Sequence, residues 1–105
     1  MSSESAERRA AVFAADLFFR AKLEGVIRAA GWTPVRTAPA EVAVVDLGRP
    51  DAAVRVVELV ADGTRVLAFG SHVGADDLRR ARDLGASAVP NSQVERALAA
   101  ILESQ

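Results

Sequence analysis

The sequence predicts an α/β fold, a doubly wound parallel sheet between two layers of helices, and two observations lead to it. Short apolar runs lack helical spacing, as strands buried on both faces do, and Val42–Asp46 and Arg65–Phe69 are the expected third and fourth strands. Amphipathic segments with apolar residues three and four positions apart stand between such runs. This order is typical of a three-layer α/β/α domain, because a parallel sheet buries both of its faces.

The N-terminal part of the chain predicts one helix between two strands. The apolar run at 11–15 predicts the first strand. Asp16 follows it and has the carboxylate that a helix start needs, so we expect a helix from there to Ala30. A weak second strand is expected at 33–37, at the edge of the sheet, because Pro34 is tolerated mainly at edges or strand starts.

Two helices are expected after the third strand. Pro50 and Asp51 form a helix start before the segment 52–60. In the segment 74–84, acidic residues stand in the first turn and arginines in later turns, an order that suits the helix dipole at both ends. Both segments therefore combine a start signal with helical spacing.

A fifth strand is expected at 86–90, before a last helix that runs through Leu102. Ser92 and Glu95 have the spacing of a capping box, in which each of the two side chains bonds a backbone N–H group at the helix start. The capping box predicts that this helix begins directly after Ser92.

Composition limits the classes of function. The chain has 105 residues, and we expect a short N-terminal tail at 1–9 and a single domain at 10–105. Cysteine is absent, which excludes disulfides and cysteine-ligated metals. The net charge of −1 gives no field that attracts nucleic acid or an anionic membrane surface. Because the chain lacks both a bilayer-spanning apolar stretch and a signal-peptide pattern, we expect a cytoplasmic protein.

The carboxyl ends of the five strands are expected to meet at one edge of the sheet, where open α/β sheets bind ligands. Asp16 and Asp46 would lie on neighbouring strands there, and two carboxylates suit a hard divalent cation such as Mg²⁺. The alternative is that Asp16 only caps a helix and Asp46 only ends a strand. The polar and glycine residues expected at this edge are Asp16, Asp46, Gly70, Ser71, His72, Asn91 and Ser92.

Three segments together resemble the receiver domain of bacterial two-component response regulators. VVDLGRP at 44–50 is similar to the family's phosphoacceptor segment, in which an acid ends the third strand and a proline follows four residues later. AADLFFRAKLEGVIRAAGW at 14–32 is similar to its acidic strand end and first helix, and LRRARDLGASAVP at 78–90 to its fourth helix and the turn into the fifth strand. The resemblance implies the flavodoxin-like fold with strand order 2-1-3-4-5.

The resemblance also implies roles for individual residues. Asp46 would be the phosphoacceptor, and Gly48 would offer a backbone carbonyl to a cation such as Mg²⁺ that Asp16 and Asp46 also hold. Receivers usually have two adjacent acids after the first strand, whereas Ala15 precedes Asp16 here.

Two further positions depart from the family. The family's switch hydroxyl falls on Gly70, with Ser71 one place late, and its lysine falls near Asn91 or Ser92. The segment between residues 50 and 64 is also shorter than usual. A phosphoryl group at Asp46 would therefore lack several of its stabilising partners.

Three functions are consistent with these observations. The first is an atypical, pseudo-receiver-like stand-alone signalling domain, not an enzyme, that acts through protein–protein interaction with phosphorylation weak or absent. The second is a functional phosphoryl-accepting regulator in a phosphorelay, modified at Asp46 by a histidine kinase. The third is a small nucleotide- or cofactor-binding protein, although no glycine-rich phosphate loop follows the first strand. In receivers the fourth and fifth helices often form a dimer or partner surface, which the resemblance assigns here to Asp76, Asp77, Arg79, Arg80 and Arg82.

Overall fold

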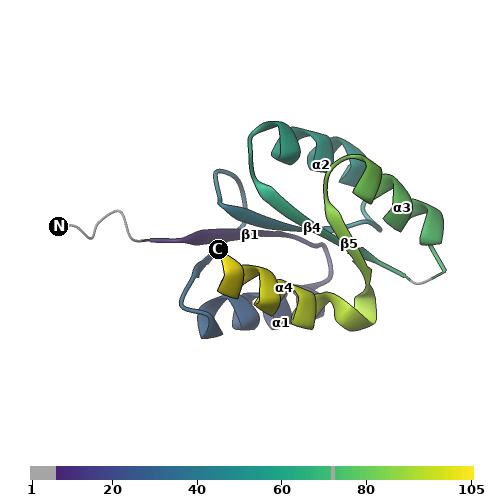
Figure 1. The fold of residues 1–105 in the computed structure, drawn as a ribbon. Coiled ribbons are helices and arrows are strands. Elements are labelled where there is room, and N and C mark those ends of the chain that lie inside the picture. The colour runs from purple at the N-terminus through teal and green to yellow at the C-terminus, as the bar shows by residue number, and fades with distance from the viewer. Residues whose placement is uncertain (1–6, 72) are drawn as a thin grey trace.

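The apolar runs of the sequence form one parallel sheet, in the order β2-β1-β3-β4-β5 that the resemblance implies. The computed structural model describes residues 7–71 and 73–105. Within them strands and helices alternate, except that β3 follows β2 without a helix between them (Figure 1). The elements are β1 (Arg9–Phe13), α1 (Leu17–Ala29), β2 (Thr33–Val35), β3 (Val42–Asp46), α2 (Ala52–Ala61), β4 (Arg65–Gly70), α3 (Ala75–Asp83), β5 (Ser87–Pro90), a 3₁₀ turn η2 (Asn91–Gln93) and α4 (Val94–Ser104).

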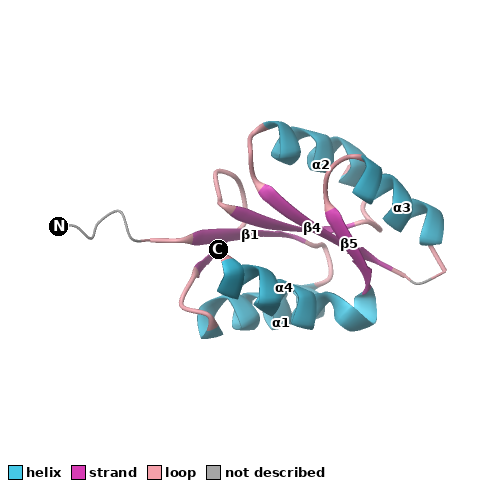
Figure 2. Cartoon of the chain, viewed as in Figure 1, coloured by secondary structure: helices cyan, strands magenta, loops and turns pink. Residues whose placement is uncertain are grey.

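Helices cover both faces of the sheet, which confirms the predicted three-layer, doubly wound architecture. Helices α1 and α4 lie on one face and α2 and α3 on the other, with the strands as the middle layer (Figure 2). Successive strand residues point to opposite faces, so every strand except the edge strand β2 contributes to two apolar clusters. The α1 and α4 side buries Leu23, Ile27, Leu98 and Leu102 against Val12, Val44, Leu67 and Phe69. The other side buries Val56, Leu59, Leu78 and Ala81 against Phe13, Val45, Val66 and Ala68.

The helices are short, because each one only crosses the sheet once. The longest helix of the described part, α1, has 13 residues. Among residues 7–71 and 73–105, none of the helices has the length and apolar character needed to cross a bilayer.

The first two strands differ from their predicted limits. Strand β1 runs over Arg9–Phe13 instead of 11–15, because Arg9 pairs with Thr33 at the start of the ladder although its side chain is exposed. Ala14 and Ala15 belong to the connection that leads into α1. Strand β2 ends at Val35 and occupies the predicted edge position, so only three residues of the expected 33–37 pair with β1. The end of a strand is defined by backbone pairing, which an apolar run in the sequence does not show. The predicted limits of β1 and β2 were therefore wrong.

The predicted capping box at the last helix was also wrong. Pro90 has an extended backbone, and the chain turns directly after it into η2, which contains Ser92. Helix α4 therefore begins at Val94, and neither η2 nor α4 has a side-chain cap hydrogen bond. The capping box requires an extended residue immediately before the helix, and here Pro90 has that conformation two residues before Ser92.

Candidate functional site at the carboxyl edge of the sheet

Asp46 lies at the carboxyl end of β3, where the sequence places it. The β3–β4 register pairs it with Phe69, and the next residue, Leu47, donates its backbone N–H to the Phe69 carbonyl at 2.8 Å. The side chain of Asp46 is half-buried, and its Oδ1 accepts a hydrogen bond from the backbone N–H of Gly48 at 2.8 Å. No described residue bonds its Oδ2. Asp46 is therefore held in one orientation with one oxygen still available at the edge of the sheet.

Asp16 caps helix α1. Its backbone is extended, and its Oδ1 accepts hydrogen bonds from the backbone N–H groups of Phe18 and Phe19, at 2.8 and 3.3 Å. A cap of this kind stabilises a protein by about 1 kcal/mol. This confirms the predicted cap, which was one of the two interpretations of Asp16.

Asp16 and Asp46 do not share one hollow. Seven residues line the hollow around Asp46, and Asp16 is not among them: they are Ala15, Arg20, Asp46, Gly48, Arg49, Pro50 and Asp51. The described residues contain no group of three or more acidic, histidine or cysteine side chains that could hold a metal ion. A cation here would have Asp46 and Gly48 close by, whereas Asp16 does not line the hollow.

Two arginines line the same hollow, and the sequence did not identify them. Arg20 comes from the first turns of α1 and folds back, so that its Nη2 donates to the Ala14 carbonyl at 2.5 Å. Its Nε and Nη1 are buried and have no hydrogen-bond partner among the described residues. Buried donors without partners cost about 1–3 kcal/mol each. The only feature of the sequence that pointed to Arg20 was its position four residues after the helix cap Asp16.

Arg49 is partly neutralised. Its Nε donates to Asp51 Oδ1 at 3.2 Å, and Arg55 of α2 lies 3.5 Å from the other oxygen of the same carboxylate. The hollow therefore contains one paired acid, Asp51, and two charges, Arg20 and Asp46, that no ion pair joins within the described chain.

The position of the family's switch hydroxyl is a glycine, Gly70, that apolar side chains border. A Cβ atom added to Gly70 would meet Leu47 Cβ at 3.4 Å and Leu78 Cδ2 at 3.9 Å. The hydroxyl of Ser71, one place later, accepts the backbone N–H of Val73 at 3.3 Å and lines a separate, smaller hollow. His72 was also expected at this edge, but it lies outside the described residues.

The position of the family's lysine contains no cation. Asn91 and Ser92 are exposed on η2, and neither lines the hollow around Asp46. The sequence has a single lysine, Lys22. It projects from α1, where its Nζ lies 3.9 Å from Glu95 of α4 and 5.0 Å from the ring centre of Phe18.

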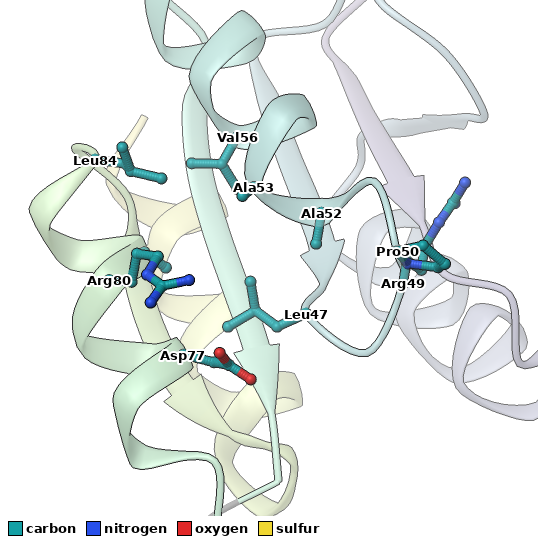
Figure 3. Close-up of a pocket in the computed structure, with 10 residues that line it drawn as sticks. Leu47, Arg49, Pro50, Ala52, Ala53, Val56, Asp77, Arg80 and Leu84 are labelled. Atoms are coloured by element: carbon teal, nitrogen blue, oxygen red, sulfur yellow. The ribbon is translucent and has the colours of Figure 1, made fainter.

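The candidate interaction residues on α3 differ in the contacts that their side chains make within the chain. Asp76 and Arg79 pair with each other, and Arg82 Nη2 donates to the Ala88 carbonyl of β5 at 2.7 Å. Asp77 and Arg80 instead face a hollow of about 170 Å³ between α2 and α3, next to Leu47, Val56 and Leu84 (Figure 3). Among these residues, Asp77 and Arg80 are the two without an ion pair or hydrogen bond from their side chains within the described chain.

Comparison with known proteins identifies the fold. No protein-family model and no curated protein matches the sequence. A response regulator from Thermotoga maritima has a similar structure, with a TM-score of 0.76 at 10% identity over 93% of this chain and 96% of that one. A response regulator from Hahella chejuensis gives 0.66 at 17% identity, over 92% and 93% of the two chains.

A third similar structure is the BeF3-activated receiver domain of Nitrogen Regulatory Protein C. Its TM-score is 0.64 at 20% identity, over 93% of this chain and 94% of that one. At these identities the similarity concerns the fold alone. The chain therefore has the flavodoxin-like fold of response regulator receiver domains, as the sequence motifs implied.

Proposed function

We propose that this chain is a stand-alone, pseudo-receiver-like signalling domain that acts through contact with another protein and accepts phosphoryl groups weakly or not at all. The receiver fold supports the signalling role. One observation carries the rest: Asp46 is in place, while the other acid of the edge, Asp16, is occupied in capping α1. We further propose that the domain is not an enzyme and works in the cytoplasm.

The missing lysine supports weak phosphorylation, because the unpaired cation of the hollow, Arg20, is held on the Ala14 carbonyl instead. A lysine ammonium about 4 Å from a phosphoryl group contributes roughly 4 kcal/mol of attraction at an effective dielectric of about 20, before desolvation. The only lysine, Lys22, is paired with Glu95 on the α1 and α4 surface. Phosphoryl transfer depends on such positive charge, because the protein contributes mainly positioning and electrostatic stabilisation.

Incubation with Mg²⁺ and acetyl phosphate, followed by intact-protein mass spectrometry, tests the proposal. The expected result is that at most a small fraction of the protein gains one phosphoryl group. Asp46→Asn is the matched control, because it keeps the size of the side chain and cannot form an acyl phosphate. Rapid stoichiometric modification that Asp46→Asn abolishes would contradict the proposal.

That outcome would support the second candidate function, a phosphoryl-accepting single-domain regulator modified by a histidine kinase. The orientation of Asp46 favours this candidate, because the Gly48 N–H group holds one carboxylate oxygen and leaves the other available. The two candidate functions therefore differ in the rate and the stoichiometry of phosphorylation, and intact-protein mass spectrometry measures both.

We propose that the contact surface lies on α3 and α4, and that a homodimer is one of its uses. Asp77 and Arg80 make no ion pair within the described residues, and they stand three positions apart on α3. Across a two-fold axis, Asp77 of one copy would meet Arg80 of the other, since such interfaces are self-complementary.

Sedimentation velocity over a range of protein concentrations tests the homodimer. Arg80→Glu is expected to weaken the association about tenfold, because it places like charges across the axis. Arg36→Glu changes the net charge equally, near the opposite edge of the sheet, and is expected to leave the association unchanged. A sedimentation coefficient that stays at the monomer value at every concentration would exclude this use of the surface.

A further inference from the structure

The hollow beside Asp46 combines one unpaired cation with one available carboxylate oxygen. We propose that this hollow binds a phosphate-class oxyanion non-covalently and without a divalent cation, with Arg20 as its cationic group. The proposal goes beyond the interaction role proposed above and does not depend on which partner binds α3. It rests on the positions of Arg20, Gly48 and Asp46 in one hollow.

Arg20 supplies the attraction for an anion. Its Nη2 is anchored on the Ala14 carbonyl, while its Nε and Nη1 have no partner among the residues described. Both nitrogens are buried in this arrangement, while the residue as a whole is half-buried and lines the hollow. The proposal therefore requires that the guanidinium rotate to present them to the ligand. Arginine is well suited to an oxyanion, because it is always charged and donates to several oxygens in fixed directions.

The neighbouring charges leave this attraction uncancelled. Asp51 lies in the same hollow, but Arg49 and Arg55 both pair with it. Asp46 is not within ion-pair distance of Arg20, since no such pair occurs in the described chain. Arg20 is therefore the one cation of the hollow without a carboxylate partner among residues 7–71 and 73–105.

Asp46 selects among oxyanions. A carboxylate repels an anion unless that anion donates a hydrogen bond to it. Inorganic phosphate carries at least one O–H group throughout the neutral pH range, and a phosphate monoester carries one only near and below its second pKa of about 6, whereas sulfate carries none. The Oδ2 of Asp46 can accept that O–H, while Oδ1 stays bonded to the Gly48 N–H. Phosphate is therefore expected to bind, and sulfate to bind much more weakly.

Nuclear magnetic resonance titrations in excess EDTA test this directly. Potassium phosphate and potassium sulfate are added separately at constant ionic strength, and the backbone amide of Gly48 and the Nε–H signal of Arg20 are followed. Phosphate is expected to give saturable shifts of both signals. Shifts that never saturate, that are equal for sulfate, or that require added Mg²⁺ would overturn the proposal.

Variants of Arg20 test its role as the cationic group that binds phosphate. Arg20→Gln is expected to weaken phosphate binding about tenfold, the usual effect of losing a charge-assisted hydrogen bond, and Arg20→Lys to restore part of it. Arg28→Gln is the matched control, an exposed arginine of the same helix, and is expected to change nothing. Arg20→Gln with unchanged affinity in a folded protein, judged by its amide spectrum, would overturn the assignment.

Asp46→Asn gives the most specific result. An asparagine amide can donate to sulfate, so the preference for phosphate over sulfate is expected to fall to about equal affinities. A preference that survives the substitution would overturn the role of Asp46. A parallel titration with O-phosphoserine distinguishes free phosphate from a phosphate monoester as the natural ligand, because the tighter of the two identifies which one the hollow fits.

Discussion

Replacement of Phe69 by alanine is expected to lower the free energy of unfolding by about 3–5 kcal/mol. Phe69 is fully buried in β4, on the α1 and α4 side of the sheet. Its ring centre lies 5.3 Å from that of Phe19 of α1. Removal of the ring leaves a cavity that neighbouring side chains fill only in part. The loss is a large share of the roughly 5–15 kcal/mol that stabilises a domain.

Urea unfolding followed by the fluorescence of Trp32 measures this loss, because Trp32 is the only tryptophan and is buried. Phe69→Leu, which keeps most of the volume, is expected to cost about 1 kcal/mol. Val73→Ala is the surface control, since Val73 is 80% exposed, and its change is expected to stay within about 0.5 kcal/mol. A loss below about 1 kcal/mol for Phe69→Ala would mean that α1 closes the cavity.

Phe69 also matters for the site, because it pairs with Asp46 across β3 and β4. The backbone at Asp46 is therefore held by its pairing with Phe69, whose side chain packs in the apolar cluster on the α1 and α4 side of the sheet. The residues of β3 and β4 that build the sheet also place Asp46 at its end.

The fold could be predicted from the sequence because its signals are local. Strand β3 has its predicted limits, Val42–Asp46, since every residue of the run but the last is buried. Asp16 could be identified as a cap because a cap bonds only residues two and three positions away. The start of β1 could not, because Arg9 is fixed by a pairing with β2 that depends on the whole sheet.

The site could be predicted only in part, because long side chains and loop hydroxyls choose among several partners. Asp46 was placed by its strand. Arg20 could not be assigned to the hollow, since its guanidinium reaches back six residues to Ala14 across a turn. Ser71 bonds the Val73 N–H group, and this depends on a loop conformation that sequence spacing does not specify. In both cases the sequence gives the residue type and its position in the chain, but not the direction in which the side chain points.

Gly85 follows α3, and two features favour a glycine there: a left-handed backbone conformation and the close approach of a side chain from α2. Gly85 has φ of +106°, and a Cβ atom built on it would lie 3.1 Å from Val60 Cγ1 of α2. Gly85→Ala is therefore expected to destabilise the protein by about 2 kcal/mol, of which roughly 1 kcal/mol or more is the left-handed conformation and the rest is displacement of Val60. Because Val60 and Gly85 join α2 to α3, the hollow between these helices is expected to change shape as well.

Gly63→Ala is the matched control for this prediction. Gly63 also has a positive φ, +82°, but a Cβ atom there would meet nothing within 4 Å. Urea unfolding of both variants separates backbone cost from contact cost. In a Val60→Ala background the cost of Gly85→Ala is expected to fall to that of Gly63→Ala, since the clashing methyl group is gone. An unchanged cost in that background would mean that Val60 already moves aside freely, and that α2 and α3 are less tightly coupled than their contact distance implies.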